Sequence, residues 1–287
     1  MNISVVGAGR VGTAMAVLLK RAGHRVVAVS GRGPTRDRAS RFLSDVPFLD
    51  PPEACRAGDL VLIGVPEDRI ASIVEELASA GAFRPGQTVA HLSGVSGLDA
   101  LAPARAAGAH VLALHPLQTF PDVAGALDRI PGSTIAVTAS EPESFSLGER
   151  IADDLLARSF RLDEEVRPLY HAAAVFASNY LIVTASIAEE LFATAGVPAP
   201  IDAMLPLQRA SLDNVERLGA AEALTGPAAR GDAHTIERHL IALEAKVPSA
   251  VDAYVVLCRS ALDLAIRAGH LSEDERRSVE AVLARWS

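Results

Sequence analysis

Short apolar runs and longer amphipathic stretches alternate over about the first 160 residues of this chain. The short runs are bounded by glycine, proline or polar residues, and they predict strands at 3–6, 26–29, 59–66, 88–92, 110–114, 133–137 and 160–162. The stretches between them carry apolar residues at helical spacing and predict helices at 14–19, 69–77, 98–107 and 143–156. This alternation is typical of an α/β domain with a doubly wound parallel sheet.

The strand pattern disappears from about Asp163 onward, and only helical patterns remain. Tyr170 to Ala195 predicts one long helix that is apolar nearly all round, so we expect it to be buried. Further helices are expected at 201–217, 233–245, 250–268 and 273–286. Pro206 should kink or delay the first of these. We therefore expect an α/β domain at residues 1–163 and an all-α domain at 164–287, without a flexible linker.

Composition places the chain among ordinary globular proteins, with 287 residues of which 49% are hydrophobic and 22% charged. The net charge of −8 disfavours binding to nucleic acid or to an anionic membrane. The sequence shows no signal-peptide pattern, and no uncharged apolar run reaches the roughly 20 residues that span a bilayer. Cys55 and Cys258 lack metal-ligand spacing, so we expect two buried thiols and no metal. A cytoplasmic protein is the expectation.

The first strand leads directly into Gly7-Ala8-Gly9-Arg10-Val11-Gly12, and an apolar helix follows. In this context the pattern predicts a dinucleotide site of the Rossmann type. Gly7 would permit the tight turn, Gly9 the close approach of a pyrophosphate, and Gly12 the packing of helix on strand. Arg10 and Val11 would lie at the helix N-terminus, which offers free N–H groups to phosphates.

The second strand ends in Ser30-Gly31-Arg32, where an NAD site would carry an acidic residue. A missing acid with an arginine nearby favours the 2′-phosphate of NADP. We expect that phosphate near Arg32, with Arg36 as a further candidate. Ligands of such sheets lie beyond the carboxyl ends of the strands, so Ser93 and His115 should share this edge with the glycine loop.

Polar residues further along the chain are candidates for chemistry. His115 could donate a proton near pH 7, or it could simply fix the His-Pro turn. His171, Ser178 and Asn179 should share one face of an apolar helix, where they either bond to one another or act on a substrate. Arg230 could hold a substrate carboxylate in its fork, although a loop arginine is more often only solvated.

Five segments occur in an order that resembles a widespread bacterial family of Rossmann-like oxidoreductases with a helical C-terminal domain. They are HLSG (91–94), HPLQTF (115–120), YHAA (170–173), SNYL (178–181) and LTGPAARGD (224–232). This family is distantly similar to pyrroline-5-carboxylate reductases, ketopantoate reductases and the 6-phosphogluconate/β-hydroxyacid dehydrogenases. The resemblance implies a homodimer formed through the helical domain and a site in the cleft between domains. It also implies that Val65 and Pro66 pass under the nicotinamide ring.

The chain departs from these relatives at the proton donor. Ketopantoate reductases and β-hydroxyacid dehydrogenases carry a lysine on the first helix of the second domain, followed by an asparagine. This chain has only Lys20 and Lys246, which leaves His171 and Asn179 as the polar pair on that helix. The His-Pro turn is similar instead to that of prephenate dehydrogenases, whose histidine contacts the substrate hydroxyl. The donor is therefore either His115 or His171.

The leading hypothesis is an NADP-dependent oxidoreductase that transfers hydride to or from a small keto, hydroxy or imino acid. Ketopantoate is the first substrate to test, by analogy of fold. In this hypothesis Asn179 and Ser93 orient the carbonyl, and Arg230 holds the carboxylate. The alternatives are a prephenate-type oxidation and a non-catalytic NADP-binding sensor or assembly module, which the missing lysine favours.

Overall fold

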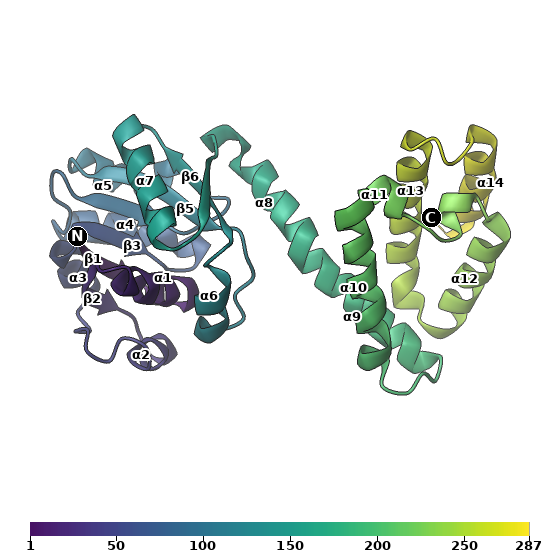
Figure 1. The fold of residues 1–287 in the computed structure, drawn as a ribbon, viewed down its shortest axis with the longest axis horizontal. Coiled ribbons are helices and arrows are strands. Elements are labelled where there is room, and N and C mark those ends of the chain that lie inside the picture. Colours follow the sequence, from purple (N-terminus) through teal and green to yellow (C-terminus); the bar gives the residue numbers. More distant parts are fainter. Residues whose placement is uncertain (287) are drawn as a thin grey trace. The chain divides into compact units, whose positions relative to one another are not determined.

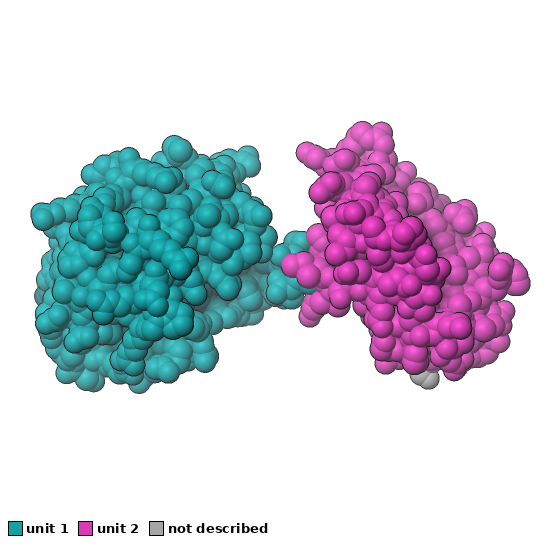
Figure 2. All heavy atoms as spheres, turned by 90° about the horizontal axis from the view of Figure 1, so that it is seen from below, with its two compact units in different colours: residues 1–179 teal, residues 180–287 magenta. Residues whose placement is uncertain are grey.

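We analysed a computed structural model that describes residues 1–286. The chain divides into two compact units, Met1–Asn179 and Tyr180–Ser287, which are coloured separately in Figure 2. The division falls inside the long helix that begins the helical part of the chain, later than the boundary expected after residue 163. All residues expected at the cofactor therefore belong to the first unit.

The first unit is built around a seven-stranded sheet with the order β2-β1-β3-β4-β5-β6-β7. The strands are β1 (Asn2–Val6), β2 (Arg25–Ser30), β3 (Leu60–Ile63), β4 (Thr88–His91), β5 (His110–Pro116), β6 (Thr134–Ala139) and β7 (Arg158–Arg161). Because β2 and β3 lie on opposite sides of β1, the strand order reverses there. Such a reversal opens a crevice at the carboxyl ends of the strands, which is where ligands of this fold bind.

Helices cover both faces of this sheet, as Figure 1 shows. They are α1 (Arg10–Arg21), α2 (Pro34–Ser40), α3 (Pro51–Ala57), α4 (Ile70–Ser79), α5 (Ala102–Ala106), α6 (Val123–Arg129) and α7 (Pro142–Asp154). Alternate residues of β3 point into different apolar clusters: Leu60 and Leu62 pack with α1, whereas Val61 and Ile63 pack with α4. The doubly wound α/β fold is therefore confirmed.

One pairing differs from the expected all-parallel sheet, because β5 and β6 run antiparallel, with His115 opposite Ala136. Both strands are buried, and a buried apolar run has the same appearance in either direction of the strand. The short helices α2 and α3 were also not predicted. Each begins at a proline and is too short to show an apolar stripe.

A continuous helical segment, Glu164–Thr194, follows the sheet. It consists of a short 3₁₀ turn η3 (Glu164–Val166), α8 (Arg167–Val175), a π turn (Phe176–Tyr180) and α9 (Leu181–Thr194). The long helix was predicted, but the prediction that it is buried was wrong. None of its most apolar stretch is buried, and Phe176 is 70% exposed. By length and composition alone this helix could cross a membrane, a test that core helices of soluble proteins also pass.

The second unit is helical, as expected. Its further helices are α10 (Pro200–Leu218), α11 (Ala220–Ala223), α12 (Ala233–Lys246), α13 (Val251–Arg267) and α14 (Glu273–Leu283). Ile236, Leu262 and Val279 come from three of these helices and lie in one buried cluster. Helix α10 continues through Pro206 and begins at Pro200, so the proline does not delay it. Cys55 and Cys258 are buried free thiols.

Candidate functional site

The glycine loop after β1 packs directly against the end of β3. Gly7 has a φ of +83°, which favours glycine, and a Cβ there would lie 2.4 Å from Cγ1 of Val65. A Cβ on Gly64 would lie only 2.5 Å from the carbonyl oxygen of Gly7. A Cβ on Gly12 would lie 3.1 Å from Cγ1 of Val5, which is the close contact of helix and strand that the motif predicted. A side chain at Gly7 or Gly64 would therefore overlap the facing segment, and one at Gly12 would press against Val5.

The loop is fixed from its other side by β2. The backbone N–H groups of Gly7 and Ala8 both donate to the carbonyl oxygen of Ser30, at 3.0 and 2.8 Å. Helix α1 then begins at Arg10, with Gly9 as its N-cap and no side-chain cap. The N–H groups of the first helical turn thus have no capping side chain and are available to an anion.

A cleft of about 910 Å³ lies in front of this loop. Most of the residues expected at the cofactor line it, namely Gly7, Gly9, Arg10, Val11, Ser30, Arg32, Val65 and Pro66, together with Ser93. Gly12 lies behind the loop and not on the wall. The cleft therefore connects the glycine loop with the ends of β2, β3 and β4.

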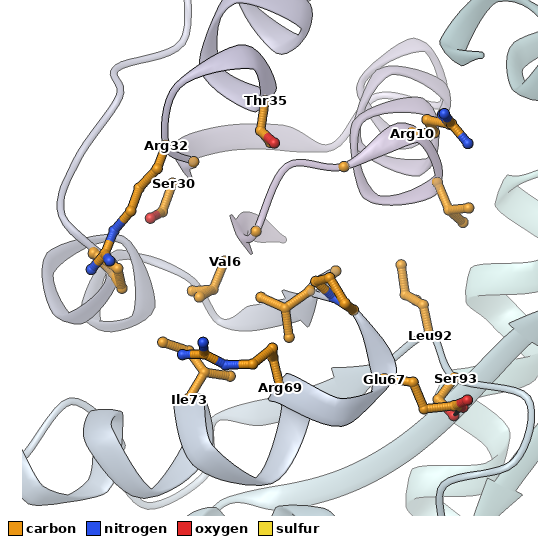
Figure 3. A pocket seen from close by; sticks show the side chains of 18 of the residues that line it. Val6, Arg10, Ser30, Arg32, Thr35, Glu67, Arg69, Ile73, Leu92 and Ser93 are labelled. Carbon is orange, nitrogen blue, oxygen red and sulfur yellow. Dashed lines mark hydrogen bonds between the residues drawn. The ribbon is translucent and has the colours of Figure 1, made fainter. Parts of the chain in front are cut away.

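One end of the cleft is basic. Arg32, Arg38 and Arg69 line the cleft, as does Glu76, whose carboxylate lies 3.9 Å from the Arg69 guanidinium. Figure 3 shows Arg32 and Arg69 on the side of the cleft away from Arg10. Arg36 lies elsewhere, with its guanidinium 5.4 Å from the centre of the Phe48 ring. Arg38, one helical turn from Thr35 on α2, lines the cleft in place of Arg36.

The other end of the cleft is formed by Ser93, which follows β4, and by Glu67, which follows Pro66 (Figure 3). The Ser93 hydroxyl donates to a carboxylate oxygen of Glu67 and accepts from the N–H of Ser96 at 2.8 Å. Glu67 was not a candidate from the sequence, because a lone glutamate after a proline carries no pattern. Its carboxylate holds the Ser93 hydroxyl in one orientation.

Buried polar groups hold the loop of residues 93–97 from below. His91 is fully buried, with Nε2 3.1 Å from the carbonyl oxygen of Gly97, while Nδ1 accepts from the N–H of Ser93 at 3.2 Å. Burial lowers the pKa of His91 to about 4, so the ring is neutral and serves the loop as a structural group. The fully buried Arg167 donates to the carbonyl oxygens of Ser93 and Ser96.

Three aromatic side chains gather behind Ser93. Nδ1 of His115 lies 2.8 Å from the hydroxyl of Tyr170, and the centroid of the His171 ring is 6.1 Å from that of His115. A Cβ on Gly94 would lie 2.5 Å from His171 Cδ2 and 2.9 Å from His115 Nε2, so only glycine lets the backbone approach both rings. The structure thus brings together Ser93, His115 and His171, all three predicted from the sequence.

The protonation of His115 differs from the expected one. Burial, together with the smaller effects of His171 and Arg167, lowers the pKa of His115 to about 4, against a smaller opposite effect of Glu67. At neutral pH the ring is therefore uncharged, and it can act only as a neutral N–H donor and an acceptor. Burial raises the pKa of Tyr170 to about 12, so its phenol remains protonated.

Two other predicted residues are not part of this cluster. Asn179 is exposed in the π turn, and its side chain makes no hydrogen bond within residues 1–286. Arg230 ends a short 3₁₀ turn (Ala228–Arg230) in the second unit and is exposed. Asp232, two residues further on, caps α12 by accepting from the N–H of Thr235 at 3.0 Å. The catalytic roles given to Asn179 and Arg230 remain predictions.

Comparison with known proteins agrees with this architecture. Residues 1–116 match the model of a Rossmann-like domain, and residues 133–261 match a domain of unknown function, DUF2520. No curated protein sequence matches the chain.

Among solved structures, the chain is similar to a candidate NADP oxidoreductase from Bacteroides fragilis, with 25% identity and a TM-score of 0.76 over 91% of this chain and 98% of that one. It is also similar to an imine reductase from Myxococcus stipitatus in complex with NADP⁺, with 19% identity, a TM-score of 0.60, and 100% and 99% of the two chains covered. A variant of that enzyme in complex with NAD⁺ has 18% identity and a TM-score of 0.60, covering 99% and 98%. Both imine reductase likenesses show the fold alone.

Proposed function

We propose that this chain is an NADP-dependent oxidoreductase that transfers hydride between the nicotinamide and a small keto, hydroxy or imino acid. The observation that carries the proposal is the cleft itself, which joins a glycine loop, a basic end and an end with oriented polar groups. The solved structures named above support it, because they include an NADP oxidoreductase candidate and an imine reductase with NADP⁺ bound.

The residues present fit such a cofactor. A Cβ on Gly7 would collide with Val65, so glycine lets this loop lie close against the end of β3. The loop and the free first turn of α1 together form a cradle that would hold a pyrophosphate. Arg32, with Arg38 close to it in the sequence, would hold the 2′-phosphate, because no acidic residue ends β2. When bound, the reduced cofactor supplies a hydride.

The end of the cleft at Ser93 would receive the substrate. The Ser93 hydroxyl gives its proton to Glu67, so it can only accept a hydrogen bond from the substrate. The neutral His115 lies behind Ser93 and can donate one to a carbonyl oxygen or an imine nitrogen. His171 stays a second candidate for the proton donor, and Arg230 a candidate for the carboxylate. A prephenate-type oxidation would use the same His115.

Cofactor choice tests the proposal at the basic end. Hydrogen bonds to a charged group contribute about 1.5–3 kcal/mol, so Arg32→Ala should weaken NADPH binding roughly ten- to a hundredfold and NADH binding little. Titration of both cofactors against the wild type measures this, and equal losses for the two would contradict the NADP assignment.

Turnover tests the chemistry. We expect the wild type to oxidise NADPH with at least one compound from a panel of 2-keto acids, including ketopantoate, and cyclic imines. Tight NADPH binding without turnover on the whole panel would favour the alternative of a cofactor-binding sensor or assembly module.

We also propose that a second copy of the chain covers the exposed apolar helix. Leu169, Phe176 and Ile182 are 73%, 70% and 63% exposed in the single chain. A large apolar patch on a soluble protein marks an interaction site. An uncharged patch is complementary to itself, which suits the two-fold contact of a homodimer.

A further inference from the structure

The side chain of His115 has two ring nitrogens with different surroundings. Nδ1 lies 2.8 Å from the hydroxyl of Tyr170, and the two rings meet edge to face at 88°. Nε2 has no hydrogen-bond partner among residues 1–286, and it faces the backbone of Gly94 next to Ser93. Nδ1 is therefore engaged with Tyr170, and Nε2 is left without a partner beside Gly94, the residue that follows Ser93 of the cleft wall.

The direction of the Tyr170 bond decides which nitrogen carries the proton. Both groups are neutral at pH 7, since burial keeps the phenol protonated and the imidazole unprotonated. A phenol is a better hydrogen-bond donor than a neutral imidazole N–H, and an imidazole nitrogen is a better acceptor than a phenol oxygen. The hydroxyl therefore donates to Nδ1, which leaves the single ring proton on Nε2.

We infer that Tyr170 is a positioning residue that holds His115 as its Nε2–H tautomer, so that a neutral N–H faces the reducible group of the substrate. This inference rests on the proposed function for the identity of that group as a carbonyl oxygen or imine nitrogen. The role of Tyr170 in fixing the tautomer does not depend on it. His115 then stabilises negative charge as a hydrogen-bond donor, and it does so without an imidazolium.

The surroundings of His115 agree with a neutral ring. The charged or titratable groups near it are His171 and Arg167 from α8, Glu67 from the turn after β3, and His91 from β4. Arg167 disfavours a second positive charge, and the carboxylate of Glu67 already accepts from the Ser93 hydroxyl.

The chain offers a matched control in its second unit. Tyr254 and His239 repeat the same contact, with the hydroxyl 2.8 Å from Nδ1 and the rings meeting at 87°. Tyr254→Phe therefore makes the same chemical change on a tyrosine–histidine pair that belongs to the other unit.

The test is nitrogen NMR of the full-length protein with ¹⁵N-labelled histidine at pH 7, with the His115 signals assigned by their loss in His115→Gln. We expect the Nε2–H pattern for His115 in the wild type. In Tyr170→Phe the ratio of Nε2–H to Nδ1–H should fall by roughly two- to tenfold, the range given by the loss of one hydrogen bond. Tyr254→Phe should leave the His115 signals unchanged.

An Nδ1–H pattern in the wild type would overturn the inference, as would an unchanged ratio in Tyr170→Phe. If Tyr170→Phe does not fold, the wild-type pattern alone decides between the two tautomers. The measurement needs no substrate, so a failure of the proposed function would appear separately, as an absence of NADPH oxidation on the compound panel.

Discussion

Substitution of Gly64 by alanine should displace the glycine loop although no residue of the loop itself is changed. The new Cβ would lie 2.5 Å from the carbonyl oxygen of Gly7, whereas the shortest ordinary carbon–oxygen contacts are about 3.3 Å. One of the two backbones must therefore move by roughly 0.8 Å. Neither is free to move: Gly64 donates to Val6 at 2.8 Å, and the Gly7 oxygen accepts from Gly9 at 2.7 Å.

The size of the effect follows from this overlap. Forcing an extra methyl into a packed site costs about 1–3 kcal/mol. If the strain falls on the cradle, NADPH affinity drops roughly five- to 150-fold, since 1.4 kcal/mol corresponds to a factor of ten. If it falls on the sheet instead, the midpoint of thermal unfolding drops by about 2–4 °C for each kcal/mol.

Gly125→Ala is the matched control. Gly125 lies in α6, and a Cβ there would be 3.4 Å from an Asp122 oxygen, an ordinary contact. Alanine should be neutral or slightly stabilising in a helix. The assay is NADPH titration by nicotinamide fluorescence, with a thermal scan of each variant. A Gly64→Ala protein with wild-type affinity and wild-type unfolding would refute the reasoning.

Two further predictions concern stability and assembly. His91 and His115 have pKa values of about 4 in the folded chain against an ordinary value near 6.5, so the unfolded chain takes up protons first as the pH falls. Each histidine should therefore lower the free energy of unfolding by about 2 kcal/mol between pH 7 and pH 5, as measured by urea denaturation. His115→Gln should lose part of this pH dependence. An unfolding free energy that does not change with pH would contradict both pKa values. Phe176→Glu should convert the proposed dimer to a monomer, as measured by light scattering. Leu156→Glu, at an exposed residue outside the helix, should leave the dimer intact. A wild-type protein that is already monomeric would contradict the proposal.

The fold was predictable wherever a local pattern determines it. Strand and helix periods place β1 to β7 and the main helices. The antiparallel direction of β6 was not predictable, because it depends on pairing with β5 and not on its own residues. The exposure of α9 was also missed, because apolarity alone does not say what covers a helix.

The candidate site was likewise predictable only where neighbouring residues in the sequence determine it. The glycine loop is contiguous in the sequence, and its glycines follow from backbone geometry that a motif can encode. The bonds of Ser93 to Glu67 and of His115 to Tyr170 join residues 26 and 55 positions apart. Such pairs arise from the packing of α8 and the turn after β3 against the sheet, and a single sequence has no period that reports them.

The continuous helix Glu164–Thr194 contacts the candidate site near its start and exposes an apolar surface further along. Near its start, Arg167 fastens it to the loop of residues 93–97, and Tyr170 and His171 contact His115. Further along, it presents the apolar residues Phe176 and Ile182 to solvent. A partner chain that covers this face would therefore make the same helix that positions the His115 ring more rigid. The conformation of the residues around Ser93 and His115 would then depend on protein concentration.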